Sequence, residues 1–301
     1  MNLSHTNLIS IHEKPKTELI TYGIKMVGAP LEWPETMGEG IKIGIIDTGI
    51  DPYHEDLKSN IFAMRNFTRS RIAVDENGHG THVCGICCAA KNNMGVVGVA
   101  PRAKLCVAKA FEKDGSALQE SIISSIKWLC DMGVRIINMS FSSDNYTDPY
   151  YYTIENAYQK GVCFICAAGN GGYSPQAIGY PAKFNETISV TAVDLNKRHA
   201  PFSSIGPYAD IAAAGVDIYS TYPRNRYATL SGTSMATPLI SGCVALIQAK
   251  AKRRFKRYLT PYEVKLMLGM YAEELGIPGR DYVFGYGIFS FGRIDKTDFL
   301  I

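Results

Sequence analysis

The amino-acid sequence predicts an α/β protein: a twisted, mainly parallel sheet with helices on both faces. The first observation is a series of short apolar runs of strand length, as expected of strands that are buried on both faces. These runs span residues 41–47, 104–110, 135–140, 162–168 and 187–193. The second observation is that stretches of helical length, 117–132 and 151–160, lie between successive runs. Such alternation predicts right-handed crossovers that place the helices on the sheet faces.

Composition and charge exclude several classes of protein. The chain of 301 residues is long enough for one large domain or two small ones, and 46% hydrophobic with 20% charged residues is typical of a globular protein. A net charge of +3 is too small to indicate a nucleic-acid partner. No stretch approaches the roughly 18 apolar residues of a membrane span, and the polar residues 1–16 do not form a signal peptide.

Cysteine usage predicts the compartment. All eight cysteines lie inside apolar runs, as free thiols in a reducing compartment do. Cys84, Cys87 and Cys88 are spaced closely enough to raise the alternative of a metal site. No second cysteine pair with zinc spacing completes such a site. We therefore interpret the cysteines as structural thiols and predict a cytoplasmic protein.

The first segments of the chain lead into the sheet. Residues 1–20 are a polar extension, and residues 22–33 are interpreted as an arm packed on the surface of the domain. The apolar run 41–47 then ends in Asp47, which Thr48 and Gly49 follow. A carboxylate at the C-terminal edge of a parallel strand is placed where open α/β sheets carry their functional sites.

Two further polar motifs stand at the starts of predicted helices. Residues 77–82 (Asn-Gly-His-Gly-Thr-His) precede an apolar helix that extends to about Ala90. Residues 230–238 lead into a long apolar helix, with Ser234 at its N-terminal end. Unpaired N–H groups there favour negative charge, so Ser234 is either a nucleophile or a simple helix cap. The basic residues 250–257 are interpreted as cations at the helix C-terminus rather than as a polyanion site.

The three motifs together carry a family resemblance. Asp47, His79 and Ser234 can meet at one edge of the sheet, and their order along the chain is that of one known type of serine protease. From about residue 22 to residue 291 the chain resembles the subtilisin-like serine proteases, and in organisation it is most similar to the intracellular subtilisins. The resemblance implies a three-layer fold in which residues 21–301 form the catalytic domain.

The resemblance also implies a reaction. The chain is expected to be a serine endopeptidase that acts on extended peptides or proteins through an acyl-enzyme on Ser234. His79 takes the role of general base, and Asp47 fixes the tautomer of its imidazole. His82, three residues further along the helix, is expected to be a packed structural histidine.

Substrate-binding residues are assigned by the same resemblance. Asn170, in Ala-Ala-Gly-Asn, matches the family's oxyanion-hole amide; read alone, Asn170 and Gly171 are a common turn pair. The residues matched to substrate binding are Asp114, Gly115 and Ser116 on one edge, Ser140, Phe141 and Ser142 on the other, and Gly179 at the floor of the specificity pocket. An empty floor predicts an aromatic or long aliphatic residue before the scissile bond. However, residues 141–143 (Phe-Ser-Ser) replace the family's usual Leu-Gly-Gly.

Residues 90–96 match the calcium loop of the family in length and register. Carbonyl and carboxylate oxygens of such a loop suit a hard cation. The expected ligands are Asn92, the carbonyls of Ala90, Met94 and Val96, and the carboxylates of Asp56 and Glu18. The alternative is a surface loop with ordinary turn chemistry.

The organisation of the N-terminus leaves alternatives open. Intracellular subtilisins carry a short extension that blocks the cleft, and residues 7–11 (Asn-Leu-Ile-Ser-Ile) echo its motif without the Pro and Tyr. Inhibition by residues 1–20 is therefore a hypothesis, and a mature fragment without its pro-region is the alternative.

Two other functions remain open: a catalytically silent regulatory relative, and a processing protease or peptide ligase dedicated to one substrate. A homodimer is expected only by analogy with the intracellular relatives.

Overall fold

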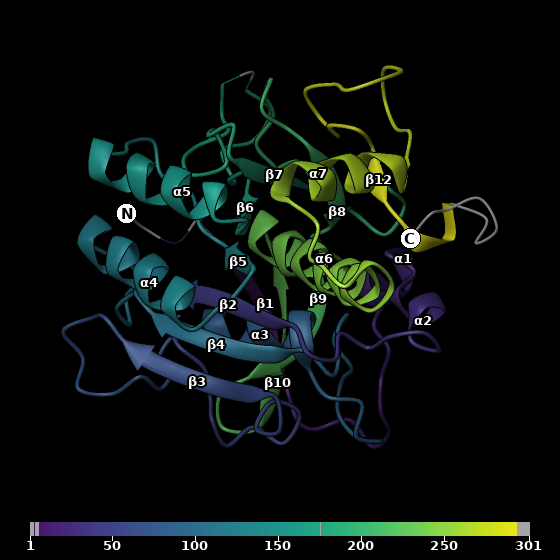
Figure 1. Ribbon diagram of the computed structural model, residues 1–301. Helices are drawn as coiled ribbons and strands as arrows, with labels where there is room; N and C mark the ends of the chain where they lie inside the picture. The colour runs from purple at the N-terminus through teal and green to yellow at the C-terminus, as the bar shows by residue number, and fades with distance from the viewer. Residues whose placement is uncertain (1–2, 4–5, 175, 294–301) are drawn as a thin grey trace.

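A nine-stranded sheet forms the centre of the protein, whose computed structural model describes residues 3, 6–174 and 176–293 (Figure 1). The strand order is β11-β12-β8-β7-β6-β5-β2-β4-β3, and all neighbours are parallel except β11 and β12. The strands are β2 Lys42–Asp47, β3 Ile61–Asn66, β4 Lys104–Lys109, β5 Ile136–Met139, β6 Cys163–Ala167, β7 Thr187–Val193, β8 Ile211–Ala214, β11 Ala272–Glu273 and β12 Ile288–Phe289. All five strands predicted from the sequence are therefore present.

Helices cover both faces of this sheet, as the alternating pattern predicts (Figure 1). On one face, α4 (Gln119–Asp131) and α5 (Asp148–Gln159) enclose a core that includes Ile126 and Phe164. On the other face, α3 (His79–Cys88) and α6 (Thr233–Phe255) pack together in a larger core. The expected three-layer α/β fold is confirmed.

Shorter elements close the ends of the sheet. The arm predicted at 22–33 contains two short helices, α1 (Tyr22–Met26) and α2 (Ala29–Glu32). The remaining helices are α7 (Pro261–Met270), which begins with a capping box of Thr260 and Glu263, and the 3-10 turn η1 (Phe291–Arg293). One residue of the basic cluster 250–257 is not simply a cation at the C-terminus of α6. The ammonium of Lys250 is buried, and its Nζ lies 2.8 Å from Oε2 of Glu32.

The position of β2 explains where a functional site can form. After β2 the chain builds β3 and β4 on one side, and then β5 to β8 on the other. The connections therefore diverge at the carboxyl ends of β2 and β5, which is the crevice where open α/β sheets bind ligands. Asp47 is the last residue of β2, and Ser140 directly follows β5.

A second, three-stranded antiparallel sheet lies beside the large one, in the order β1-β10-β9. Its strands are β1 (Asn7–His12), β9 (Ile218–Tyr222) and β10 (Arg226–Ser231). Residues 7–11 echo the inhibitory motif of the family in sequence, but neither the strand β1 nor the β9–β10 hairpin is predicted from the sequence. Residues 7–12 of the N-terminal extension thus form an edge strand of the folded domain.

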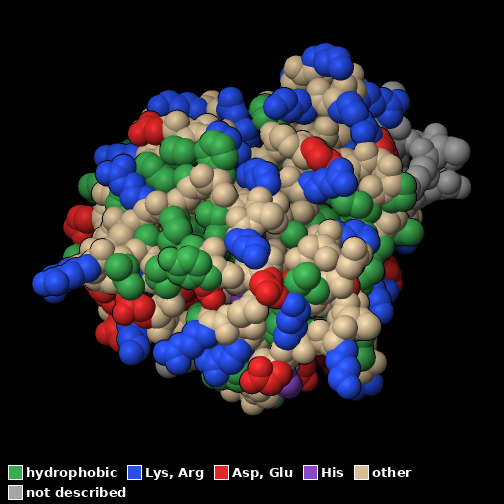
Figure 2. Space-filling model, turned by 90° about the horizontal axis from the view of Figure 1, so that it is seen from below, with side chains coloured by type: hydrophobic (Ala, Val, Ile, Leu, Met, Phe, Trp, Pro, Cys, Tyr) green, Lys and Arg blue, Asp and Glu red, His purple; other side chains and the backbone are tan. Residues whose placement is uncertain are grey.

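Surface and cysteine chemistry agree with a globular protein. All eight cysteines are free, seven are buried and Cys130 is half-buried, which confirms the structural interpretation. Within the described ranges, every helix is too short or too polar to cross a membrane. On the face shown in Figure 2, Lys and Arg side chains are scattered among acidic and apolar ones.

Candidate active site

Asp47 and His79 form a buried hydrogen-bonded pair at the carboxyl end of β2. The Oδ1 atom of Asp47 lies 2.8 Å from Nδ1 of His79, the first residue of α3, and both side chains are almost fully buried. Burial lowers the pKa of His79, but the charge and hydrogen bond of Asp47, with the nearby charge of Asp75, outweigh burial and raise it above 6.5. Because Asp47 occupies Nδ1, Nε2 is the ring nitrogen that remains for another partner.

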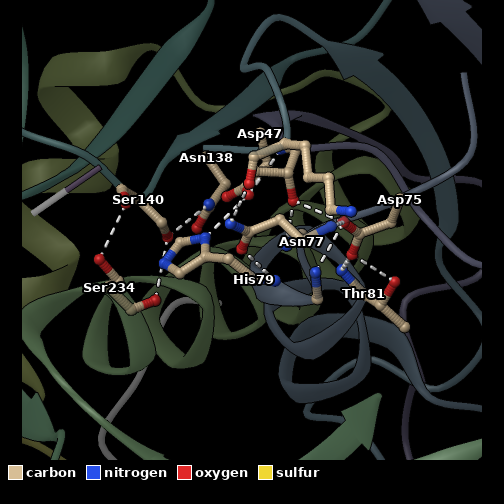
Figure 3. A network of polar contacts seen from close by, with 12 residues as sticks. Asp47, Asp75, Asn77, His79, Thr81, Asn138, Ser140 and Ser234 are labelled. Carbon is tan, nitrogen blue, oxygen red and sulfur yellow. Dashed lines mark hydrogen bonds and ion pairs between the residues drawn. The ribbon is translucent and has the colours of Figure 1, made fainter. Parts of the chain in front are cut away.

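Ser234 lies on the Nε2 side of the imidazole (Figure 3). It is the second residue of α6, is fully buried, and its hydroxyl donates to the carbonyl of Ser140 over 2.8 Å. The hydroxyl of Ser140 in turn donates a 3.0 Å hydrogen bond to the carbonyl of Ser234. Within the described residues, Nε2 of His79 has no hydrogen-bond partner. In this structure the Ser234 hydroxyl is therefore bonded to Ser140 and not to His79.

Asn170 follows β6 and points its amide at the start of α6. Its Oδ1 accepts hydrogen bonds from the backbone N–H and the hydroxyl of Thr233, at 3.0 and 2.9 Å. This fixes the plane of the amide, so that Nδ2 lies beside Gly232, where an added Cβ would be 3.3 Å from it. An amide N–H held next to the helix start of a serine nucleophile can stabilise a developing oxyanion.

Asp75 is a buried carboxylate of the site that was not predicted from the sequence. Its two oxygens accept hydrogen bonds from the hydroxyls of Thr48 and Thr81, and from the backbone N–H groups of Asn77, Gly78 and Thr81. Asp75 thus ties the loop after Asp47 to the start of the helix that carries His79 (Figure 3). An Asp a few residues before a predicted helix start is a capping signal, which could have revealed it.

The loop before His79 also depends on Gly78. Its φ of +109° lies in the left-handed region, and a Cβ there would collide with the ring of Tyr222.

His82, one turn further along α3, is buried, and its Nε2 lies 3.0 and 3.1 Å from the carbonyls of Ile218 and Ala228. Burial lowers the pKa of His82 to about 3, so it is neutral. The expectation of a structural role for His82 is confirmed.

The predicted substrate segments lie beside this centre. Ser143 forms two backbone hydrogen bonds with Tyr180, at 2.7 and 2.9 Å, which brings residues 140–143 against the loop of Gly179. Ser142 fills part of the space there: its hydroxyl would collide with a Cβ on Gly179 and would be 3.1 Å from one on Gly169. Phe141 instead points into the core and packs on Phe111, with ring centroids 4.9 Å apart.

The other predicted edge is in contact with the N-terminal extension. Asp114 accepts hydrogen bonds from the N–H and the hydroxyl of Ser116, which shapes the turn around Gly115. The carbonyl of Gly115 accepts a 2.8 Å hydrogen bond from the N–H of Leu3. Thr6 lies next to Gly232, and an added Cβ on that glycine would be 3.5 Å from the Thr6 hydroxyl. The extension therefore touches one predicted substrate edge, at Gly115, and also lies next to the turn that precedes Ser234.

The predicted calcium residues come together around the loop 90–96. Asp56 accepts hydrogen bonds from the N–H of Val96 and the amide of Asn92, at 2.9 and 3.1 Å. Glu18 accepts from the N–H groups of Asn92 and Asn93, at 2.8 and 2.7 Å. Within the described part of the chain, no three His, Cys, Asp or Glu side chains form a metal-binding group. A donor set of two carboxylates, one amide and loop carbonyls nevertheless fits the oxygen preference of a hard cation.

Fold and site together define a serine hydrolase with an aspartate-supported histidine. A family model described as the Subtilase family matches residues 38–287, and the chain belongs to this family. It is therefore a serine endopeptidase, whose substrates are peptides or proteins.

The relatives cover most of the chain. It is 40% identical over 266 residues to an intracellular serine protease of Paenibacillus polymyxa, covering 86% of this chain and 82% of that protein. It is 41% identical over 237 residues to subtilisin DY of Bacillus licheniformis, covering 77% and 86%. It is 36% identical over 272 residues to the major intracellular serine protease of Bacillus subtilis, covering 87% and 83%.

Proposed function

We propose that this endopeptidase cleaves peptide bonds through an acyl-enzyme on Ser234. The observation that carries the proposal is the 2.8 Å contact between Asp47 and His79, which leaves Nε2 of the imidazole on the side of Ser234. As Ser234 Oγ attacks the scissile carbonyl, Nε2 takes its proton, and later donates it to the leaving amine. Asp47 holds the tautomer and stabilises the imidazolium. Asn170 Nδ2 and the backbone N–H of Ser234 donate to the oxyanion.

The test of this proposal is cleavage of an unfolded protein by the purified chain and by Ser234→Ala. We expect new peptide termini, identified by mass spectrometry, that are absent with the variant. A chain that cleaves nothing even when its N-terminal extension is displaced would instead support the catalytically silent alternative.

Residues 1–20 are proposed to inhibit the enzyme by lying in its cleft. Support comes from the hydrogen bond of Leu3 to Gly115, on a predicted substrate edge, and from the position of Thr6 next to Gly232, two residues before Ser234. These contacts lie where an extended substrate would bind between the two edges. The full chain should be less active than a chain that begins near Leu19, and equal activity of the two would refute inhibition.

Substrate choice is proposed to depend on Ser142. The large residue expected before the scissile bond requires an empty floor at Gly179, but the Ser142 hydroxyl lies between Gly169 and Gly179. We infer that small or polar side chains are preferred at this position. Such a restricted preference is also compatible with a processing protease or peptide ligase dedicated to one substrate. Cleavage of a peptide library should show this preference, and a majority of cuts after Phe, Tyr or Leu would contradict it.

Calcium is proposed to bind at the loop 90–96. The residues that would hold it are the side chains of Asp56, Glu18 and Asn92 with the carbonyls of Ala90, Met94 and Val96. The ion would link Glu18 of the N-terminal extension to the loop, so its removal should loosen both. A chelator should lower the melting temperature, and an unchanged value would argue against this site.

The cytoplasm is proposed as the place of action. Two relatives are named intracellular proteases, and the eight free thiols suit a reducing compartment. Sedimentation of the purified chain tests the homodimer that is expected by analogy; a monomer at micromolar concentration would contradict it.

A further inference from the structure

The edge of β10 is covered by the N-terminal strand in this structure. Asn7 opposes Ser231, and the pairing continues to His12 opposite Tyr227, with one irregularity between Leu8 and Ser10. We propose that β10, from Leu230 to Arg226, is a binding site for the segment of a long substrate that follows the scissile bond. This inference rests on the proposed endopeptidase mechanism. The substrate would add to β10 as an antiparallel strand, in the place that β1 occupies in cis.

The path of the extension shows how such a segment would reach β10. Leu3 lies at Gly115, Thr6 lies next to Gly232, and Asn7 opposes Ser231, three residues before the nucleophile. An extended chain that passes Ser234 in the same direction therefore enters the β10 register directly. The residues after its scissile bond would meet Leu230, Thr229 and Ala228 in turn.

The contacts of β1 show that this edge recognises backbone rather than sequence. Leu8, Ile9 and Ile11 are exposed by 49, 53 and 43%, so their side chains add little buried apolar area. The contacts that hold β1 are mainly those of an antiparallel ladder. At the far end of β1, Nε2 of His12 also lies 3.1 Å from the Thr229 hydroxyl oxygen. The ring centroids of His12 and Tyr219 are 5.2 Å apart. An extended chain of varied sequence could replace β1.

The hairpin that presents this edge is held by contacts that do not involve β1. The carbonyls of Ile218 and Ala228 lie within hydrogen-bond distance of His82 on α3, and the Tyr227 hydroxyl donates to Asp56 over 2.9 Å. Displacement of β1 would therefore leave β10 in place as the edge of a two-stranded sheet. Such an edge carries unpaired N–H and C=O groups and readily pairs with another extended chain.

Binding tests the site without relying on catalysis. The full chain carries Ser234→Ala, with Leu8→Pro and Ile11→Pro to break the β1 ladder. A fluorescent peptide with seven residues after its scissile bond should bind at least about tenfold tighter than one with two, because ladder bonds are gained. The free peptide Asn7–His12 should remove that gain and leave binding of the short peptide unchanged. Equal affinity of the long and short peptides would overturn the proposal.

Hydrogen exchange shows where the long peptide binds. Those amides of residues 226–231 that face away from β9 should lose protection in the proline variant and regain it with the long peptide but not with the short one. Persistent protection without peptide means that β1 is still paired; the same comparison is then made with Ser10→Pro added. Binding of the long peptide without protection of these amides would place its contacts elsewhere and overturn the proposal.

Kinetics separates this proposal from the mechanism on which it rests. In the Leu8→Pro, Ile11→Pro chain with Ser234 intact, kcat/KM should rise about tenfold with length after the scissile bond, mainly through a lower KM. N-methylation of successive peptide N–H groups there should remove the gain at alternate positions, as an antiparallel ladder requires. Cleavage that is indifferent to this length and methylation would refute the β10 site alone. Tight binding without any cleavage would refute the mechanism alone.

Discussion

The proposed catalytic centre and the N-terminal strand are neighbours, but they are held in different ways. Asp47, His79 and Ser234 are buried and fixed by side-chain hydrogen bonds at the ends of β2, α3 and α6. The strand β1 is held mainly by backbone pairing with β10, and most of its side chains are exposed. The proposed chemistry thus lies in the rigid layers of the fold, whereas the strand proposed to limit access to it is held mainly by ladder bonds.

The largest effect should come from the most buried contact of the centre. Asp47→Asn should lower kcat by about 10⁴-fold, because the amide favours the wrong tautomer of His79. Asp51→Asn is the matched control: Asp51 is also buried near β2, but it bonds to the backbone of Arg224 and Asn225. Steady-state kinetics should show near-normal kcat for this control. Equal losses in both variants would mean that the role of Asp47 is merely structural.

Asn170→Ala tests the donor that the sequence assigned to the oxyanion. It should lower kcat by about 10²–10³-fold with little change in KM, a magnitude that was measured in a subtilisin and is carried over to this chain. Asn92→Ala, in the predicted calcium loop, serves as the control and should keep kcat. A change confined to KM in Asn170→Ala would point to ground-state binding instead.

Disrupting the pairing of β1 should raise activity, whereas the two preceding substitutions lower it. In the full chain, Leu8→Pro with Ile11→Pro should raise kcat/KM about tenfold to a hundredfold, because ladder bonds of β1 that compete with substrate are lost. Ile9→Thr changes an exposed side chain and keeps the ladder, so its activity should match the wild type. Unchanged activity of the proline variant would show that the strand does not limit access.

Ser142→Gly should have a smaller effect that is confined to specificity. Removing the hydroxyl opens the space between Gly169 and Gly179, so the ratio of kcat/KM for Phe over Ala before the scissile bond should rise about tenfold. Ser143→Gly, whose hydroxyl bonds to the Asn145 carbonyl, is the neighbouring control. The account of Ser142 fails if both variants leave this ratio unchanged.

The smallest effect is a shift in pH dependence. Neutral His79 is needed to accept a proton, so kcat/KM should fall as pH drops through its raised pKa, with a midpoint above 6.5. Asp75→Asn removes one of the charges that raise this pKa, so the midpoint should move to lower pH. Glu76→Gln, an exposed neighbour, should leave the midpoint in place. A loss of activity in Asp75→Asn without a shifted profile would make Asp75 a structural residue only.

The sequence predicted the sheet and the centre for a physical reason. Apolar runs and helix starts are local signals, and Asp47, His79 and Ser234 stand directly at them. Family resemblance then supplied Asn170, whose turn-like neighbours would otherwise have favoured a different interpretation.

What the sequence missed depends on contacts between distant segments. The strand β1 forms because β10 offers an edge more than 200 residues away, and its own residues show no clear alternation. The role of Asp75 depends on Thr48, which lies in another loop. The Ser142 hydroxyl matters only because the loop of Gly179 packs against it. Non-local pairing and packing of this kind leave little trace in a local pattern.

The most direct test of the contrast between a fixed centre and a removable strand is labelling by a fluorophosphonate. The reagent should modify one serine, Ser234, and Ser234→Ala should abolish labelling. The wild-type chain should react more slowly than the Leu8→Pro, Ile11→Pro chain, because β1 restricts access to an otherwise competent nucleophile. Equal rates in the two chains, or labelling that survives Ser234→Ala, would contradict this account.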